Sequence, residues 1–68
     1  MDNYAICLRN NKPFIKGRIY KAGNVYLYNK IPNIEVYTKI KAYPFFITDS
    51  NFCFIINPSE EIVEKLLN

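Results

Sequence analysis

Apolar and polar residues alternate along most of this chain, and a period of two is typical of half-buried β-strands. The longest uninterrupted alternation covers residues 34–41. Its two faces would carry Ile34, Val36, Thr38 and Ile40 on one side and Glu35, Tyr37, Lys39 and Lys41 on the other. A shorter β-prone run covers residues 4–9, and residues 10–13 then interrupt it as a turn or loop. The pattern therefore predicts a chain built mainly of short strands.

A first hairpin is predicted around Gly23-Asn24. This dipeptide separates the β-prone runs 18–22 and 25–28. Glycine supplies the positive φ that a type II′ turn requires, so we expect the two runs to pair directly. Residues 28–33 would then form a loop before the next strand.

A second hairpin is predicted around residues 49–51, which separate the apolar runs 45–48 and 52–56. Residues 42–44 would interrupt the sheet before it. The run 52–56 carries no charge and is apolar on both faces. We expect it to be a central strand covered on both sides, because an exposed apolar edge favours aggregation.

The end of the chain has the pattern of a short helix over residues 58–67. Asn57 is placed to be the N-cap, Pro58 the first helical residue and Glu60 the residue three after the cap. Ile62, Val63, Leu66 and Leu67 share one face. An isolated helix this short is unstable in water, so its apolar face must dock on the sheet.

Together these elements predict one domain over residues 1–68 with a mainly β fold. The expected architecture is a small five-stranded antiparallel barrel or strongly bent sheet with one C-terminal α-helix. Half of the residues are hydrophobic and 16% are aromatic, which supplies apolar area for a core. The expected core consists of Ile6, Leu8, Ile19, Val25, Leu27, Val36, Ile40, Ile47, Phe52, Phe54, Ile56, Val63 and Leu66.

The two cysteines indicate a reducing compartment. Cys7 and Cys53 each lie inside an apolar run, so we interpret both as buried free thiols. A disulfide between them is the alternative, and it would require a secreted protein. The first residues show neither a basic nor an apolar region of a signal peptide, and no apolar run reaches the roughly 20 residues of a membrane span. A cytoplasmic protein without a membrane partner is expected.

The residue types argue against catalysis. The chain has no histidine, which is the commonest general base and neutral metal ligand. Two cysteines alone do not make a structural zinc site, and Gly17 and Gly23, the only glycines, form no phosphate-binding loop. The late carboxylates fit a capped and solvated helix. We therefore expect a protein that is not an enzyme and that uses no cofactor or metal.

The charge is unevenly placed. Residues 1–43 carry eight Lys/Arg and two Asp/Glu (+6), and residues 44–68 carry one Lys and four Asp/Glu (−3), which gives the net charge of +3. The candidate partner-binding residues are the aromatic and basic positions of the expected outer face, namely Arg18, Tyr20, Tyr26, Tyr28, Tyr37, Lys39 and Lys41. Such a face fits a protein contact. With Lys21 it also fits nucleic acid. A third interpretation is that the tyrosines only cover the sheet.

Residues 14–21, Phe-Ile-Lys-Gly-Arg-Ile-Tyr-Lys, carry a resemblance to a known group. They resemble the Lys-Gly-x-Ile/Val-Tyr turn and strand of very small bacteriophage and prophage proteins with Src-homology-3-like barrels. The resemblance implies a long loop over residues 10–17 after the first strand, with Gly17 at its tight end. It also implies a virus-encoded protein that binds and modulates or inhibits a host protein, in defence or metabolism, inside a bacterial cell. Two alternatives are a nucleic-acid-binding barrel and a homo-oligomer that binds a small nucleotide at its interface.

Overall fold

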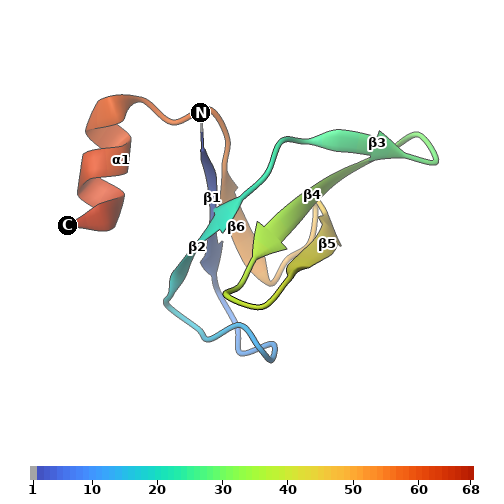
Figure 1. Cartoon of the computed structure of the whole chain (residues 1–68), viewed down its shortest axis with the longest axis horizontal. Coiled ribbons are helices and arrows are strands. Elements are labelled where there is room, and N and C mark those ends of the chain that lie inside the picture. Colours follow the sequence, from blue (N-terminus) through green and yellow to red (C-terminus); the bar gives the residue numbers. More distant parts are fainter. Residues whose placement is uncertain (1) are drawn as a thin grey trace.

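A computed structural model describes residues 2–68, which form a curled antiparallel sheet and one C-terminal helix (Figure 1). The elements are β1 (Asn3–Cys7), β2 (Ile19–Ala22), β3 (Tyr26–Tyr28), β4 (Ile31–Tyr37), β5 (Ala42–Phe46), β6 (Phe52–Ile55) and α1 (Glu60–Leu67). Each strand pair is antiparallel. The predicted mainly β fold, a bent antiparallel sheet with a C-terminal helix, is confirmed.

β2 and β3 act as two halves of one bent strand. β2 pairs with β4 at Ala22 and Val36, and the Gly23 N–H then donates to the Glu35 carbonyl at 2.8 Å. β3 continues along the same edge of β4, because β5 occupies the opposite edge. Counted in this way the sheet has five strands in the spatial order β5, β4, β2/β3, β1 and β6. It forms a half-barrel with β5 and β6 at its two ends.

The hairpin predicted at Gly23-Asn24 is wrong. The chain runs on through these residues, and the turn lies at Asn29 and Lys30, whose φ angles are 51° and 65°. Two positive φ values are what a two-residue type I′ hairpin requires, and Asn tolerates this conformation well. The loop expected over residues 28–33 is therefore the hairpin turn and the start of β4. Gly23 has another role, since a Cβ there would lie 2.6 Å from the Tyr37 hydroxyl.

The second predicted hairpin is also wrong. β5 pairs with β4 and β6 pairs with β1, so residues 47–51 connect two distant edges of the sheet. Residues 42–44, expected to interrupt the sheet, belong to β5, where an edge position tolerates Pro44. β6 is a terminal strand rather than a central one. Its Cys53 is consequently exposed, whereas Cys7 is buried as predicted, and both are free thiols.

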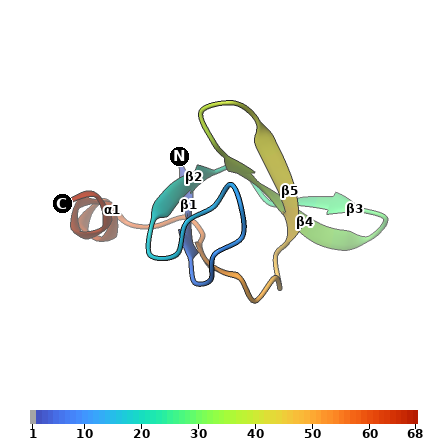
Figure 2. The same cartoon turned by 90° about the horizontal axis from the view of Figure 1, so that it is seen from below.

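Phe14 is the centre of the core, although it lies in the loop between β1 and β2. Its side chain is 2% exposed and makes edge-to-face contacts with Tyr20, Tyr43, Phe45 and Phe52 at centroid distances of 4.9–5.5 Å. Seen from below, the loop crosses the open end of the half-barrel (Figure 2). The other buried members of the cluster are Ala5, Cys7, Ala22, Ile34, Val36 and Phe52.

Several predicted core residues are not buried. Val36 and Phe52 are buried, and Ile6, Ile47, Phe54, Val63 and Leu66 are half-buried. The prediction is wrong for Leu8, Ile19, Val25, Leu27, Ile40 and Ile56, which are exposed. Ile40 is 91% exposed because β4 ends at Tyr37 and the Thr38 hydroxyl accepts hydrogen bonds from the N–H groups of Ile40 and Lys41 at 3.2 Å. In β1 it is Ala5 and Cys7 that belong to the core cluster, one residue out of register with the prediction.

The helix begins two residues later than predicted. Ser59 is its N-cap and its hydroxyl accepts from the Ile62 N–H at 3.3 Å, whereas Asn57 has a φ of 49° and Pro58 precedes the cap. Asn3 ties this linker to the sheet, because its Oδ1 accepts from the Asn57 N–H at 2.8 Å and its Nδ2 donates to the Gly23 carbonyl at 2.9 Å.

α1 lies beside β1 and β6, on the opposite side of the molecule from β3 (Figure 1). None of its eight residues, all of them described, is buried. Val63 and Leu66 are half-buried, while Ile62 and Leu67 remain exposed. Over residues 2–68, no helix combines the length and apolar character needed to cross a membrane.

Candidate functional site

The fold divides the predicted site residues between two grooves. We call the first the basic groove and define it by Arg18, Ile19, Tyr20, Tyr37, Lys39 and Tyr43. We call the second the aromatic groove and define it by Tyr26, Tyr28, Asn33, Pro44, Phe46 and Asp49. Arg18, Tyr20, Tyr37 and Lys39 of the predicted set thus meet in one place, and Tyr26 and Tyr28 in another. Lys41 is next to the basic groove, with its ammonium 4.7 Å from the centre of the Tyr43 ring.

The basic groove arises where two strands separate. β2 pairs with β1 along its whole length, but it pairs with β4 only at its last residue, Ala22. The resulting gap lies between the long loop after β1 and the turn over residues 38–41, both of which face the viewer in Figure 2. The hollow has a volume of about 610 Å³.

One wall of the basic groove is held by hydrogen bonds within the long loop. The Ile15 N–H donates to the Tyr20 hydroxyl at 2.8 Å, and the Tyr20 ring rests edge-on against Phe14. The Gly17 N–H donates to the Cys7 carbonyl at 2.7 Å, and Gly17 has a φ of +87°. These contacts fix the loop against the sheet, so the wall is formed before any ligand arrives. The long loop over residues 10–17 with Gly17 at its end is the arrangement that the sequence resemblance implied.

The basic groove has one sign of charge. Arg18, Lys21 and Lys39 line it, and within residues 2–68 no carboxylate does so. Lys21 approaches Asp2 at 3.9 Å, but both side chains are well exposed and solvent screens such a pair. A hollow lined by charges of one sign concentrates ligands of the other sign. The groove therefore favours an acidic ligand.

The basic groove also exposes branched aliphatic side chains, which the sequence did not identify as site residues. Ile15, Ile19 and Ile40 all line it, and each is exposed. Ile15 belongs to the segment that carries the family resemblance, but nothing in its sequence context distinguishes it from a core residue. Their position next to three cations makes the groove suitable for a ligand with both acidic and apolar groups.

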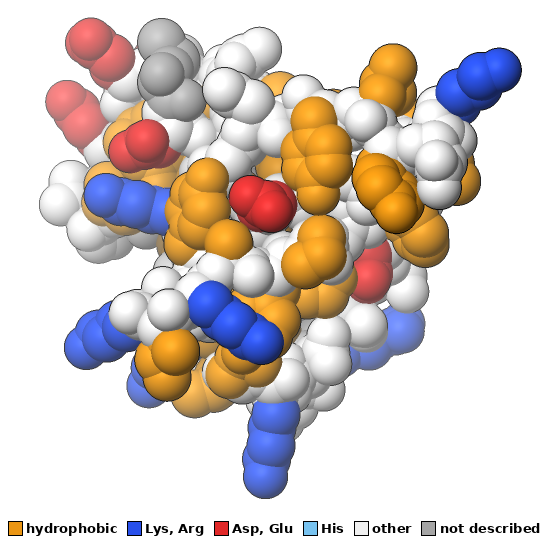
Figure 3. All heavy atoms as spheres, turned by 45° about the vertical axis from the view of Figure 1, so that its right-hand side comes forward, with side chains coloured by type: hydrophobic (Ala, Val, Ile, Leu, Met, Phe, Trp, Pro, Cys, Tyr) orange, Lys and Arg blue, Asp and Glu red, His pale blue; other side chains and the backbone are white. Residues whose placement is uncertain are grey.

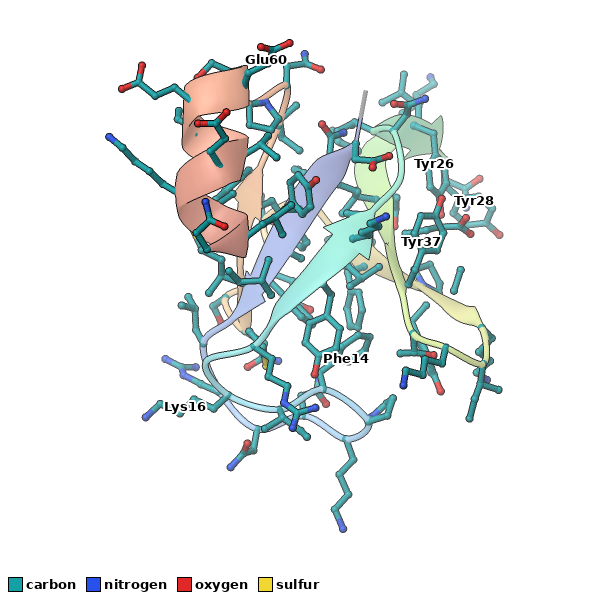
Figure 4. All side chains as sticks on the ribbon, turned by 60° about the vertical axis from the view of Figure 1, so that its left-hand side comes forward. Phe14, Lys16, Tyr26, Tyr28, Tyr37 and Glu60 are labelled. Atoms are coloured by element: carbon teal, nitrogen blue, oxygen red, sulfur yellow. The ribbon has the colours of Figure 1, made fainter. Side chains whose placement is uncertain are left out.

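The aromatic groove is built on the regular part of the sheet. Tyr26 pairs with Asn33, and Asn33 pairs with Phe46, so the three residues form a row across β3, β4 and β5. Tyr28 lies two residues from Tyr26 and shares its face. Figure 4 shows Tyr26, Tyr28 and Tyr37 on the same side of the sheet. Tyr37 nevertheless belongs to the basic groove, and its hydroxyl lies over Gly23.

Asp49 gives the aromatic groove the opposite charge. It is the only charged residue among those that line this groove within residues 2–68. One carboxylate oxygen, Oδ1, accepts from the Asn51 N–H at 2.8 Å. Figure 3, which brings the β3–β5 side forward, shows acidic side chains among the hydrophobic ones. Sequence alternation had identified Tyr26 and Tyr28, but Phe46 and Asp49 join them only through the pairing of β5 with β4.

Within residues 2–68, no three His, Cys, Asp or Glu side chains are grouped so that they could hold a metal ion. Comparison with protein-family models, with curated proteins and with solved structures gave no match. The function must therefore be argued from the grooves themselves.

Proposed function

We propose that this protein is a non-catalytic binding domain whose basic groove holds an acidic and apolar segment of a partner protein. The observation that carries the proposal is the position of three exposed isoleucines beside three cations in one preformed hollow. Aliphatic side chains bury apolar surface of a partner, and the cations attract its carboxylates. Tyrosine and arginine, both present in this groove, are enriched among residues that dominate protein interfaces.

We further propose that the partner is a host protein of a bacterial cell. A bacteriophage or prophage protein that modulates or inhibits a host protein in the bacterial cytoplasm fits a small binding domain. The order of the strands supports the resemblance to Src-homology-3-like barrels. A first strand is followed by a long loop, a bent second strand and two further hairpin strands, and the last strand returns to pair with the first.

A nucleic-acid ligand is the second candidate, and one observation favours it. Tyr20, Tyr37 and Tyr43 lie in the same groove as Arg18, Lys21 and Lys39, and such a mixture can stack bases and neutralise phosphates. The isoleucines argue for the protein partner, because aliphatic side chains neither stack on bases as aromatic rings do nor contact phosphates.

The test is capture of partners from bacterial lysate by the tagged protein, with and without nuclease, followed by affinity measurements on the captured protein. Lys39→Glu should weaken binding about tenfold or more, because a like charge would face the partner's acidic groups. Ile40→Ser should weaken it about fivefold through lost apolar contact. The matched controls are Lys65→Glu and Leu67→Ser, which change an exposed cation and an exposed apolar residue on α1.

The outcomes separate the candidates. Capture that survives nuclease and fails in both groove variants, but not in the controls, supports the proposal. Material lost on nuclease treatment, with an affinity that falls steeply as salt rises, would favour nucleic acid. A partner that binds both groove variants with unchanged affinity would disprove the role of the basic groove. Light scattering on the same samples tests the homo-oligomer, which requires a mass above that of the monomer.

A further inference from the structure

We propose that the aromatic groove is a separate site that binds an arginine side chain of a partner protein. This site shares no lining residue with the basic groove. The inference therefore stands independently of the function proposed above. It rests on three features of the groove, which are its aromatic rings, its single carboxylate and one unpartnered amide oxygen.

The rings provide faces for a flat cation. Tyr28 is 64% exposed, Phe46 is 53% exposed, and Tyr26 lies in the cross-strand row that contains Phe46. Aromatic faces attract cations through the negative charge of the π-system, and the guanidinium of arginine stacks on them more often than the ammonium of lysine. The hollow has a volume of about 540 Å³, which is ample for one arginine side chain.

Asp49 supplies the charge. It is half-buried in the turn after β5, where its Oδ1 is engaged by the Asn51 N–H. No salt bridge to Asp49 is formed within residues 2–68. Among the described residues no hydrogen-bond donor engages its second oxygen, Oδ2, either, so this oxygen remains available to a ligand. A partly desolvated carboxylate beside aromatic rings favours a cation that also carries hydrogen-bond donors.

Asn33 adds a second acceptor to the groove. The residue is 6% exposed, and its Nδ2 donates to the Ile31 carbonyl at 2.9 Å. Among the described residues, nothing donates a hydrogen bond to the Oδ1 of Asn33. Every fully buried side-chain oxygen of these residues has a hydrogen-bond partner, so this oxygen is not fully buried. The amide oxygen thus retains some exposure, and Asn33 lines the aromatic groove.

Two acceptors without a donor partner, beside aromatic faces, match the chemistry of a guanidinium. Arginine presents five N–H donors in one plane, so it can reach a carboxylate and an amide oxygen while its face lies against a ring. Lysine has three donors but no flat face, and a neutral aromatic ligand would leave the carboxylate unpaired. These differences make the choice of ligand testable.

The experiment is an NMR titration of the ¹⁵N-labelled protein with three capped tripeptides, Ac-Gly-Arg-Gly-NH₂, its lysine counterpart and its citrulline counterpart. Citrulline has nearly the shape of arginine but no charge. We expect the arginine peptide to shift the signals of Asn33 and Asp49, with the citrulline peptide at least fivefold weaker and the lysine peptide about threefold weaker.

Three variants locate the site. Asp49→Asn keeps an acceptor for the Asn51 N–H, but it removes the charge and replaces the free Oδ2 acceptor by an amide donor, so it should lower the affinity for the arginine peptide about tenfold. Tyr28→Leu keeps an apolar side chain but removes a ring face, and should lower it about threefold. Tyr37→Leu, which removes a tyrosine of the basic groove, is the matched control and should leave the affinity unchanged.

Four results of the peptide titrations would overturn the inference. They are binding of citrulline or lysine as strong as that of arginine, shifts confined to the basic groove, no saturable shift up to the solubility limit of the peptide, and an unchanged affinity in Asp49→Asn. Shifts of the aromatic groove that follow protein concentration without peptide would assign the groove to a second copy of the chain, and would equally disprove the proposal.

Discussion

The two grooves share β4 and are both rich in tyrosine, but they are constructed in different ways. The aromatic groove lies on a regular face of the sheet, where pairing places Tyr26, Asn33 and Phe46 in one row. The basic groove lies where the pairing stops, between β2 and β4, and the loop that carries Phe14 forms one of its walls. The shape of the aromatic groove is therefore set by strand register. The shape of the basic groove is set by the loop that fills the gap between β2 and β4.

Replacing Phe14 should have the largest effect and should affect the basic groove more than the aromatic groove. Phe14→Ala removes a ring that contacts four other aromatic side chains, and we expect a loss of about 3–5 kcal/mol in the free energy of unfolding. Urea denaturation followed by circular dichroism measures this loss. Ile40→Ala, at a groove residue that is 91% exposed, is the control and should change stability by less than about 0.5 kcal/mol. Equal losses in the two variants would contradict the central place of Phe14.

Gly23→Ala should have the next largest effect. It should change the shape of the basic groove and leave the aromatic groove unchanged. The added Cβ would lie 2.6 Å from the Tyr37 hydroxyl and 3.4 Å from Cζ, so Tyr37 must shift within the basic groove. We expect a destabilisation of about 1–2 kcal/mol, which is typical of overpacking.

A second change tests the cause of that loss. Tyr37→Phe removes the clashing oxygen and should restore part of the stability when added to Gly23→Ala. NMR spectra of the single variant should show shifts near Tyr37 with Tyr26 and Tyr28 unmoved. A loss that Tyr37→Phe does not reduce would mean that the backbone, and not the ring, requires glycine.

Gly17→Ala should loosen the wall of the basic groove at a cost of about 1 kcal/mol in stability. Within residues 2–68, and apart from its two chain neighbours, no residue has an atom within 4 Å of the position of the added Cβ, so the effect comes only from the φ of +87°. Asn tolerates positive φ better than Ala, and Gly17→Asn should therefore be the milder change. Thermal unfolding of both variants tests this order, and a reversed order would contradict the backbone argument.

Ser59→Ala should have the smallest effect and should leave both grooves unchanged. It removes the acceptor of the Ile62 N–H at the start of α1, for an expected loss of about 0.5–1 kcal/mol. Ser59→Asp keeps an acceptor at the cap and should preserve stability. Altered binding in either groove would show that α1 is coupled to them, which its place beside β1 and β6 does not suggest.

The elements of the fold could be predicted from the sequence better than their pairing. Alternation correctly placed Ile34 and Val36 on the inner face, because a buried face imposes a period of two. The turn predicted at Gly23-Asn24 is wrong, because Gly23 accommodates the Tyr37 side chain and does not form a turn. The true hairpin turn has Lys30 at a positive φ. A turn residue is identified by local preference, but close packing against a distant side chain has no local pattern.

The same limit explains what could be predicted of the site. Tyr26 and Tyr28 follow from alternation within one strand. Asp49 and Phe46 reach them only because β5 pairs with β4, and that pairing joins residues whose local sequence favoured a hairpin with β6. Phe14 was missed because its segment has the composition of a loop, and a loop residue enters a core only when the surrounding strands leave a gap. Such facts depend on the whole fold.

The pairing of β1 with β6 affects when the chain can fold during its synthesis. β1 gains its second partner only in β6, and the bond from Asn57 to Asn3 spans 54 residues. During synthesis, one edge of β1 therefore remains unpaired until β6 is present. Phe14 also lacks its contact with Phe52 until then. Contacts this distant along the chain slow folding. The nascent chain therefore exposes apolar surface until β6 has been synthesised. We expect the sheet to complete its folding only after β6 has emerged from the ribosome.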